Sequence, residues 1–229
     1  MAQVHLGRQV FGPIVVRYDA RVLVPRPWTL LQSEWAAELA ADAGVGPVLE
    51  LCAGAGQIGL AAAVLSGRHL VQVEADPVAA GYAEINAALA GAANRVEIRI
   101  ADLGSAFGAN ERFPLIIADP PYLPSARVSR WPDDPPTAID GGPDGLDLVR
   151  VCLQVAHRHL CPGAALLLQV AGTAQAQAVV ELLRADTTLA LEYCETRHHD
   201  HERAVMLLRR EPFTPVQPTQ PSVPRRTAT

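Results

Sequence analysis

Residues 50–59 read Glu50-Leu51-Cys52-Ala53-Gly54-Ala55-Gly56-Gln57-Ile58-Gly59. They follow an apolar run over 48–52 that predicts a short buried strand, and they lead into 57–66, which predicts a helix. Glycines between a strand and a helix let backbone N–H groups approach a ligand at the helix N-terminus. The segment therefore predicts a ligand-binding loop between a strand and a helix.

Strand and helix patterns alternate on both sides of this loop. Further strands are expected at 69–74, 95–101, 114–119 and 164–170, and helices at 29–43, 77–90, 146–159 and 174–184. This order implies an α/β fold with right-handed crossovers, in which helices cover both faces of a doubly wound, mostly parallel sheet. A short loop joins the last two strands, 189–195 and 203–209, so we expect an antiparallel strand near one edge.

The two ends of the chain differ from this alternating part. Runs over 14–17 and 21–24 are rich in β-forming residues and predict a small hairpin within an N-terminal segment, 1–28. The main domain is expected over 29–210. Residues 211–229 contain five prolines and few apolar side chains, which predicts a disordered tail.

Composition excludes several classes of function. The chain has 229 residues, of which 49% are hydrophobic and 19% charged, so it is expected to fold as one globular domain. A net charge of −5 makes nucleic acid a less favoured partner. All 19 basic residues are arginine, which excludes lysine Schiff-base chemistry and the lysine of a P-loop.

Metal sites, export and membrane insertion are not expected either. The four cysteines form no Cys-x-x-Cys pair, and adjacent histidines in the cluster 198–201 point apart on extended backbone, so we expect no metal. The N-terminus lacks a secretory signal pattern, and the apolar runs are too short to span a bilayer. These features predict a cytoplasmic protein. The sequence does not indicate an oligomeric state.

The position of Glu74 suggests that the loop binds an adenosine-containing ligand. Glu74 closes the next strand 20 residues after Gly54, where it could accept hydrogen bonds from two ribose hydroxyls. Gly54, Gly56 and Gly59 match G-x-G-x-x-G, which fits a dinucleotide and an NAD(P)-dependent oxidoreductase. S-Adenosylmethionine fits as well, because Glu50 suits a charged amino group and would repel a pyrophosphate. A non-catalytic adenosine-binding protein is a third alternative.

Two further acidic residues follow strands at the same edge of the predicted sheet. Asp102 could accept a hydrogen bond from an adenine amine, or it could cap a turn. Asp119-Pro120-Pro121-Tyr122 ends the fourth strand of the main domain. The two prolines remove two N–H donors, which leaves the Asp119 carboxylate and the Pro120 carbonyl as fixed acceptors beside the flat face of Tyr122.

Such acceptors suit one particular reaction. The nitrogen of an amide or aminopurine is poorly nucleophilic because its lone pair is delocalised. If both N–H groups donate to fixed acceptors, the nitrogen can pyramidalise and aim its lone pair at a sulfonium methyl group. The tetrad therefore predicts N-methyl transfer, with Asp119, Pro120 and Tyr122 as catalytic residues.

These segments resemble the HemK-like protein-glutamine N-methyltransferases, which are class I S-adenosylmethionine-dependent enzymes. The resemblance also includes Pro25-Arg26-Pro27 and the stretch 134–147, with its Gly-Gly-x-Asp-Gly-Leu-Asp pattern. It implies a Rossmann-like, seven-stranded sheet, a protein glutamine as acceptor, and S-adenosylhomocysteine as product. It implies substrate contacts at Asp119, Pro120, Pro121 and Tyr122, and we also expect one at Arg26. It implies cofactor contacts at Cys52, Ala53, Gly54, Ala55, Gly56, Glu74, Asp102, Leu103 and Asp119, in addition to Glu50, which its charge already places at the cofactor.

The chain departs from this family at the first residue of the tetrad. The family usually has asparagine where this chain has Asp119. Asparagine can accept from an amide N–H and donate to the amide oxygen, whereas an ionised aspartate can only accept. Asp119 therefore also suits an acceptor that presents only N–H donors, such as a small metabolite or a nucleobase amine.

Overall fold

A seven-stranded mixed sheet forms the centre of the protein. The structure is a computed structural model that describes residues 6–212, so most of the tail predicted over 211–229 lies outside the described residues. The strand order is β5-β4-β3-β6-β7-β9-β8. In this sheet β9 runs antiparallel to the other six strands, which confirms the predicted antiparallel strand near one edge. The strands are β3 (Val48–Leu51), β4 (Leu70–Glu74), β5 (Val96–Ile100), β6 (Phe113–Ala118), β7 (Leu160–Val170), β8 (Leu191–His198) and β9 (Ala204–Arg210).

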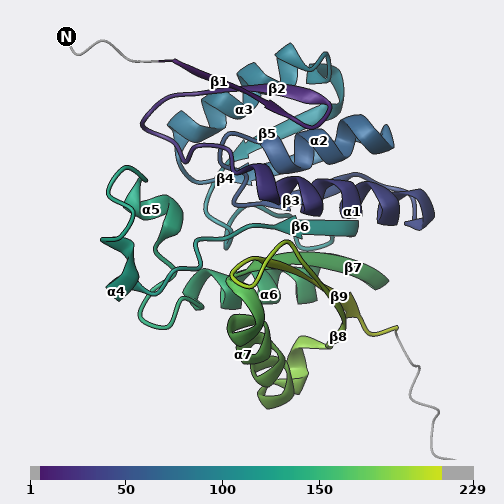
Figure 1. Cartoon of the computed structure of the whole chain (residues 1–229). Coiled ribbons are helices and arrows are strands. Elements are labelled where there is room, and N and C mark those ends of the chain that lie inside the picture. Colours follow the sequence, from purple (N-terminus) through teal and green to yellow (C-terminus); the bar gives the residue numbers. More distant parts are fainter. Residues whose placement is uncertain (1–5, 213–229) are drawn as a thin grey trace, which may run out of the picture.

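Helices cover both faces of the sheet, as predicted (Figure 1). One layer packs α1 (Leu30–Asp42), α2 (Gln57–Ser66) and α3 (Pro77–Leu89) on the sheet, and the other packs α6 (Asp147–His159) and α7 (Gly172–Ala185). Ile116 and Ile117 are adjacent in β6 and fully buried, yet they belong to opposite layers because side chains alternate along a strand. Burial of each side chain contributes about 1.5–3 kcal/mol.

The N-terminal hairpin forms, but with a different partner strand. β1 (Gly7–Phe11) pairs with β2 (Ile14–Tyr18), and Gly12 turns between them with a φ of +52°. The predicted strand over 21–24 is wrong. Asp19 accepts hydrogen bonds from the backbone N–H of Arg21 at 2.9 Å and from its guanidinium, so the chain turns there instead of extending. Asp19 also accepts from the hydroxyl of Tyr82 at 2.6 Å, which ties the segment to α3.

The loop predicted after β6 contains two short helices, α4 (Ser125–Val128) and α5 (Pro136–Ile139). Each has only four residues, which is too short to leave an apolar periodicity in the sequence. Both stand beside the carboxyl ends of the central strands, at the left of Figure 1. Three short 3₁₀ turns complete the described elements: η1 (Pro27–Thr29), η2 (Ala93–Arg95) and η3 (Thr187–Leu189).

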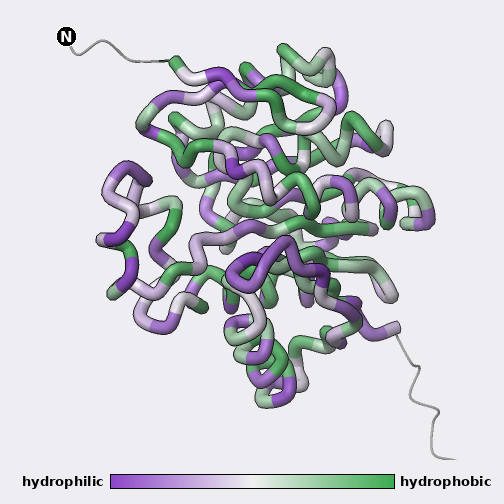
Figure 2. The backbone as a smooth tube through the Cα atoms, viewed as in Figure 1, coloured by the Kyte–Doolittle hydropathy of each residue, from purple (hydrophilic) through white to green (hydrophobic). Residues whose placement is uncertain are grey.

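Polarity follows the same layering. Figure 2 shows hydrophobic colour concentrated along the central strands and hydrophilic colour on the turn between β8 and β9. That turn holds the histidine cluster of 198–201. Within residues 6–212, no helix combines the length and the apolar character needed to cross a membrane.

Candidate functional site

Four neighbouring strands end at one rim of the sheet and bring the predicted site residues together. In the order β5, β4, β3 and β6, the strands lead to Asp102, Glu74, the loop 52–56 and Asp119, with Glu74 the last residue of β4 and the others just beyond their strands. These strands are parallel and in register, so their carboxyl ends lie side by side. Open α/β sheets bind ligands at this edge.

The three loop glycines are required for different reasons. Gly54 and Gly56 have φ angles of +56° and +81°, which favour glycine. A Cβ on Gly59 would lie 2.4 Å from a carboxylate oxygen of Glu50, so this glycine permits close packing. A Cβ on Gly54 would meet nothing within 4 Å among the described residues, so the backbone there faces open space. The loop therefore presents its backbone to a ligand.

Cys52 also adopts a left-handed conformation, with a φ of +57°. An L side chain in this conformation costs about 1–2 kcal/mol, so the backbone here would suit a glycine better. The neighbouring Cys152 thiol and burial raise the pKa of Cys52 well above its ordinary value. Cys52 therefore remains a protonated thiol, which does not suit a nucleophile.

Glu74 is fixed at the rim by backbone groups. One carboxylate oxygen accepts from the N–H of Gly54 at 2.7 Å, and the other accepts from the N–H of Asp76 at 2.9 Å. A carboxylate has about four acceptor positions, so two stay open for hydroxyl groups. The geometry is compatible with the predicted ribose contact, which stays a prediction.

Glu50 lies below the loop and is only 2% exposed. Its oxygens accept from the N–H of Gly59 at 2.9 Å and from the side-chain amide of Gln72 at 2.5 Å. Burial raises the pKa of Glu50 to about 7. Through these hydrogen bonds Glu50 connects β3, β4 and α2 beneath the loop. Its predicted contact with a ligand stays a prediction.

The raised pKa of Glu50 predicts a pH-dependent stability. The folded protein binds this proton more tightly than the unfolded chain, so the stability contribution is complete below pH 4.5 and is lost as the pH rises through 7. Relative to Glu50→Gln, the wild type should lose up to about 3 kcal/mol of unfolding free energy over this range. Urea denaturation of both proteins at pH 5 and pH 8 measures their unfolding free energies. If the two proteins differ by the same amount at both pH values, the pKa of Glu50 is not raised.

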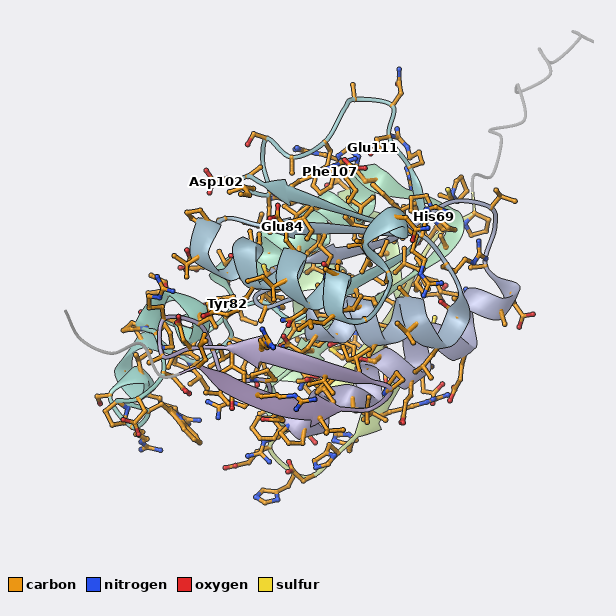
Figure 3. The ribbon with its side chains drawn as sticks, turned by 90° about the horizontal axis from the view of Figure 1, so that it is seen from above. His69, Tyr82, Glu84, Asp102, Phe107 and Glu111 are labelled. Carbon is orange, nitrogen blue, oxygen red and sulfur yellow. The ribbon has the colours of Figure 1, made fainter. Side chains whose placement is uncertain are left out.

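Asp102 and Leu103 follow β5, and Figure 3 shows the Asp102 carboxylate pointing away from the ribbon at the edge of the molecule. Within residues 6–212, the Asp102 side chain makes no hydrogen bond; only its backbone carbonyl accepts, from Ser105. The carboxylate therefore does not cap the turn, and it is available to a ligand. Leu103 is half-buried beside it.

Asp119 is a carboxylate without a partner in the described part of the chain. Among residues 6–212, no side chain or N–H donates a hydrogen bond to its oxygens, and burial raises its pKa to about 7. Pro120 is buried behind it, and no hydrogen bond from the same residues reaches the Pro120 carbonyl. Both predicted hydrogen-bond acceptors, the Asp119 carboxylate and the Pro120 carbonyl, are therefore available to a ligand.

Two buried glutamines, which the sequence did not single out, hold the tetrad at both ends. Gln32 of α1 donates to the carbonyl of Ala118, just before Asp119, at 3.0 Å. Gln175 of α7 donates to the carbonyl of Tyr122 at 2.9 Å and accepts from the N–H of Ala171 at 2.7 Å. These bonds restrict the tetrad to one backbone position.

Loss of the Gln175 hydrogen bonds to Tyr122 and Ala171 should slow turnover more than it weakens cofactor binding. In Gln175→Ala, the Tyr122 segment gains freedom, and misplacement by about 1 Å can cost about 100-fold in rate. We expect a roughly 10- to 100-fold lower kcat with little change in S-adenosylhomocysteine affinity. Steady-state kinetics and calorimetry measure the two quantities; equal losses in both would point to general unfolding instead.

A cavity of about 320 Å³ opens directly beside Asp119. The tetrad forms its base. Burial raises the pKa of Tyr122 beyond its ordinary value, so its hydroxyl stays protonated. The other walls of the cavity come from 23–29, from the segment containing α4 and α5, and from the turn between β8 and β9. We call this cavity the acceptor pocket.

Arg26 lines the acceptor pocket, where it is already paired, and its contact with a substrate stays a prediction. It forms an ion pair with Asp134, and its guanidinium lies 5.7 Å from the ring centroid of Trp28. Arg203 stacks on the same ring at 3.8 Å and pairs with Asp200 at 2.9 Å. Trp28 and Arg203 had no predicted role, because only the fold brings them together.

Known proteins with similar sequences include glutamine methyltransferases. The release factor glutamine methyltransferase of Cereibacter sphaeroides is 34% identical over 190 residues, covering 79% of this chain and 64% of that protein. The release factor glutamine methyltransferase of Moorella thermoacetica is 31% identical over 210 residues, covering 90% and 74%. This chain thus spans less than two thirds of the length of the first relative. No family model matches the chain.

The fold is also shared with solved structures. The hMettl16 catalytic domain in complex with the MAT2A 3'UTR hairpin 1 superposes with a TM-score of 0.65 at 16% identity, covering 83% of this chain and 71% of that chain. At this identity the likeness establishes the architecture alone.

Proposed function

The chain belongs to the release factor glutamine methyltransferase family, and we propose that it transfers a methyl group from S-adenosylmethionine to the amide nitrogen of a protein glutamine. The observation that carries this proposal is a pair of hydrogen-bond acceptors at the base of the acceptor pocket, the Asp119 carboxylate and the Pro120 carbonyl. Neither receives a hydrogen bond from residues 6–212. This pair lies next to a glycine loop and two carboxylates that suit an adenosine ligand.

The rim residues fit the proposed methyl donor. The left-handed backbone at Gly54 faces open space, Glu74 retains acceptor positions, and the Asp102 carboxylate makes no bond to residues 6–212. We therefore expect Cys52–Gly56 to contact the methionine part, Glu74 the ribose, and Asp102 with Leu103 the adenine. When bound, S-adenosylmethionine would supply an electrophilic methyl group on a sulfonium.

The tetrad would make the acceptor nitrogen nucleophilic. The Asp119 carboxylate and the Pro120 carbonyl would accept hydrogen bonds from the two N–H groups of this nitrogen. Tyr122 would cover the planar group that carries the nitrogen. Charge that develops on the nitrogen is stabilised by the Asp119 carboxylate, which is already in place and needs no reorganisation. Asp119 is also placed to take the proton that the nitrogen loses after transfer.

Asp119 itself favours a second candidate acceptor, a small metabolite or nucleobase amine that presents only N–H donors. The two acceptor classes differ in their response to Asp119→Asn. Glutamine transfer should survive this change, because asparagine can both accept and donate. Transfer to an amine that offers only donors should be strongly reduced.

Turnover is expected to depend on the ionisation of Asp119. Its pKa is raised to about 7, and the ionised form stabilises positive charge on nitrogen better than the neutral acid does. The value of kcat/KM should be highest above about pH 8 and should fall below pH 7 to the level of Asp119→Asn, whose neutral side chain also accepts a hydrogen bond. Because the pKa of Glu50 is also raised to about 7, Asp119→Asn is the control. If kcat/KM of this variant does not change with pH, the pH dependence of the wild type is due to Asp119. If the variant shows the same pH dependence as the wild type, Asp119 is not its cause.

Two measurements test the proposed function. Calorimetry with S-adenosylhomocysteine tests the cofactor, and absence of binding would count against the whole proposal. Intact-mass analysis of release factors incubated with methyl-labelled S-adenosylmethionine tests the acceptor. We expect one added methyl group per release factor. Cofactor binding with no labelled protein, but with a labelled amine metabolite or nucleobase, would favour the second candidate.

A further inference from the structure

The connection between β5 and β6, residues 101–112, carries the predicted adenine contacts but contains no helix. Every residue of this connection is described, and none of them lies in a helix or a strand. The other connections between successive parallel strands each contain at least one helix, which is the usual arrangement. Figure 3 shows Asp102, Phe107 and Glu111 along this connection. We call it the crossover loop, and contacts other than helical hydrogen bonds have to hold it in place.

Arg99 of β5 holds the middle and the end of the crossover loop together. Its Nη1 donates to the carbonyl of Ala106 at 3.1 Å. Its Nη1 and Nη2 also donate to the two carboxylate oxygens of Glu111, at 2.9 and 2.7 Å. Such a bidentate pair between a guanidinium and a carboxylate fixes the geometry more strictly than a single hydrogen bond. The two side chains are 21% and 29% exposed, so water screens this pair less than a fully exposed one.

The turn that carries Asp102 depends on this anchor. On one side of the turn, the N–H of Ala101 donates to a carbonyl of β4 at 3.0 Å. Within the turn, the N–H of Ser105 donates to the Asp102 carbonyl at 3.0 Å. On the other side, the first hydrogen bond to another element, among the described residues, is the one from Arg99 to Ala106. The Arg99 side chain therefore decides where the far side of this turn lies.

Aromatic packing fixes the end of the crossover loop against the sheet. The centroid of the Phe107 ring lies 4.7 Å from that of His159 and 6.1 Å from that of Phe113. His159 of α6 is buried, and its Nδ1 lies 3.0 Å from the carbonyl oxygen of Glu111. The backbone at Glu111 is thus held by the core, so its carboxylate gives Arg99 a stationary partner.

We propose that Arg99 and Glu111 are positioning residues, which hold the turn 102–105 where the Asp102 carboxylate meets the adenine amine of S-adenosylmethionine. This inference rests on the proposed function, which supplies the contact between Asp102 and adenine. All three guanidinium nitrogens of Arg99 are already bonded, since its Nε donates to Glu97 at 2.7 Å. Arg99 therefore acts through the turn and not by touching the cofactor. A purine that lacks the amine should gain nothing from this arrangement.

Two ligands that differ only at C6 of the purine test this proposal. One is S-adenosylhomocysteine, and the other is its analogue with hydrogen in place of the amine. Calorimetry should show that the wild type binds the first about 10- to 100-fold more tightly, the range of one hydrogen bond to a charged group. In Arg99→Gln and in Glu111→Gln this preference should fall to about threefold or less, because the carboxylate is no longer held at the amine. Arg99→Lys keeps the charge without the planar fork and should show an intermediate preference.

Two further comparisons separate positioning from a general loosening of the loop. The matched control Arg112→Gln removes an exposed arginine from the end of the same loop and should keep the wild-type preference. Adding Glu111→Gln to Asp102→Ala should change the affinity for S-adenosylhomocysteine by less than about twofold, since the anchor then has no carboxylate to place. In turnover, Arg99→Gln and Glu111→Gln should raise the KM for S-adenosylmethionine and leave kcat and the KM for the acceptor nearly unchanged.

The possible failures can be told apart. The wild-type preference in both Arg99→Gln and Glu111→Gln would overturn the inference and leave the proposed function intact. An equal loss of affinity for both ligands would overturn it as well, because a loosened loop weakens binding whether or not the amine is present. A wild type that binds both ligands equally would contradict the contact between Asp102 and adenine, and the inference with it. A wild type that binds neither ligand would refute the cofactor and therefore the proposed function too.

Discussion

Asp119→Ala is expected to lower methyl transfer by about 100- to 1,000-fold, the range seen when one preorganised group facing developing charge is removed. The reason is that the Asp119 carboxylate has no partner among the described residues and lies at the base of the acceptor pocket. The affinity for S-adenosylhomocysteine should change much less, because the loop and Glu74 carry most of the predicted cofactor contacts. Labelled-methyl transfer and calorimetry measure the two effects.

Two variants keep this result interpretable. Asp119→Asn retains the shape of the side chain and restores the residue usual in the family, so it should retain glutamine transfer. Asp133→Ala removes an exposed aspartate outside the pocket lining and should have little effect. Turnover that survives in Asp119→Ala would show that the tetrad does not activate the nitrogen.

Glu74→Ala is expected to weaken binding of S-adenosylhomocysteine by about 100-fold. Two hydrogen bonds to a charged acceptor are lost, each worth about 1.5–3 kcal/mol. The variant also removes the partner of the Gly54 N–H, which Glu74 holds at 2.7 Å, so the loop loses part of its support. Calorimetry measures the affinity.

The controls separate a lost ligand contact from a loosened loop. Glu74→Gln keeps one carbonyl oxygen and should fall between the wild type and Glu74→Ala. Glu84→Ala removes an exposed glutamate from α3, labelled in Figure 3, and should bind normally. Wild-type affinity in Glu74→Ala would contradict the placement of the ribose.

The rim of the site was predictable because its residues follow strands directly. Short apolar runs ending in Glu74 or Asp119 indicate where a parallel strand stops, and parallel strands end at one edge. The order of strands and helices in the sequence is therefore enough to place these residues together. The glycine loop alone did not separate a dinucleotide from S-adenosylmethionine; the family membership favours the latter.

The walls of the acceptor pocket were not predictable in the same way. Arg127 lies on a segment with no periodic pattern and Arg203 at the start of a predicted strand; they are far apart in the sequence and line one pocket only because of the fold. Gln32 and Gln175 were missed because a buried glutamine that holds a backbone carbonyl has no local signature. The strand predicted over 21–24 failed because Asp19 bonds locally to Arg21 and turns the chain.

The atom that receives the methyl group shows whether the tetrad activates an amide nitrogen. A release factor is incubated with methyl-labelled S-adenosylmethionine and either the wild type or Asp119→Ala, then digested and fragmented in a mass spectrometer. We expect label on the side-chain nitrogen of one glutamine with the wild type and almost none with the variant. Label on another atom, or equal label with both proteins, would refute activation of the amide by Asp119.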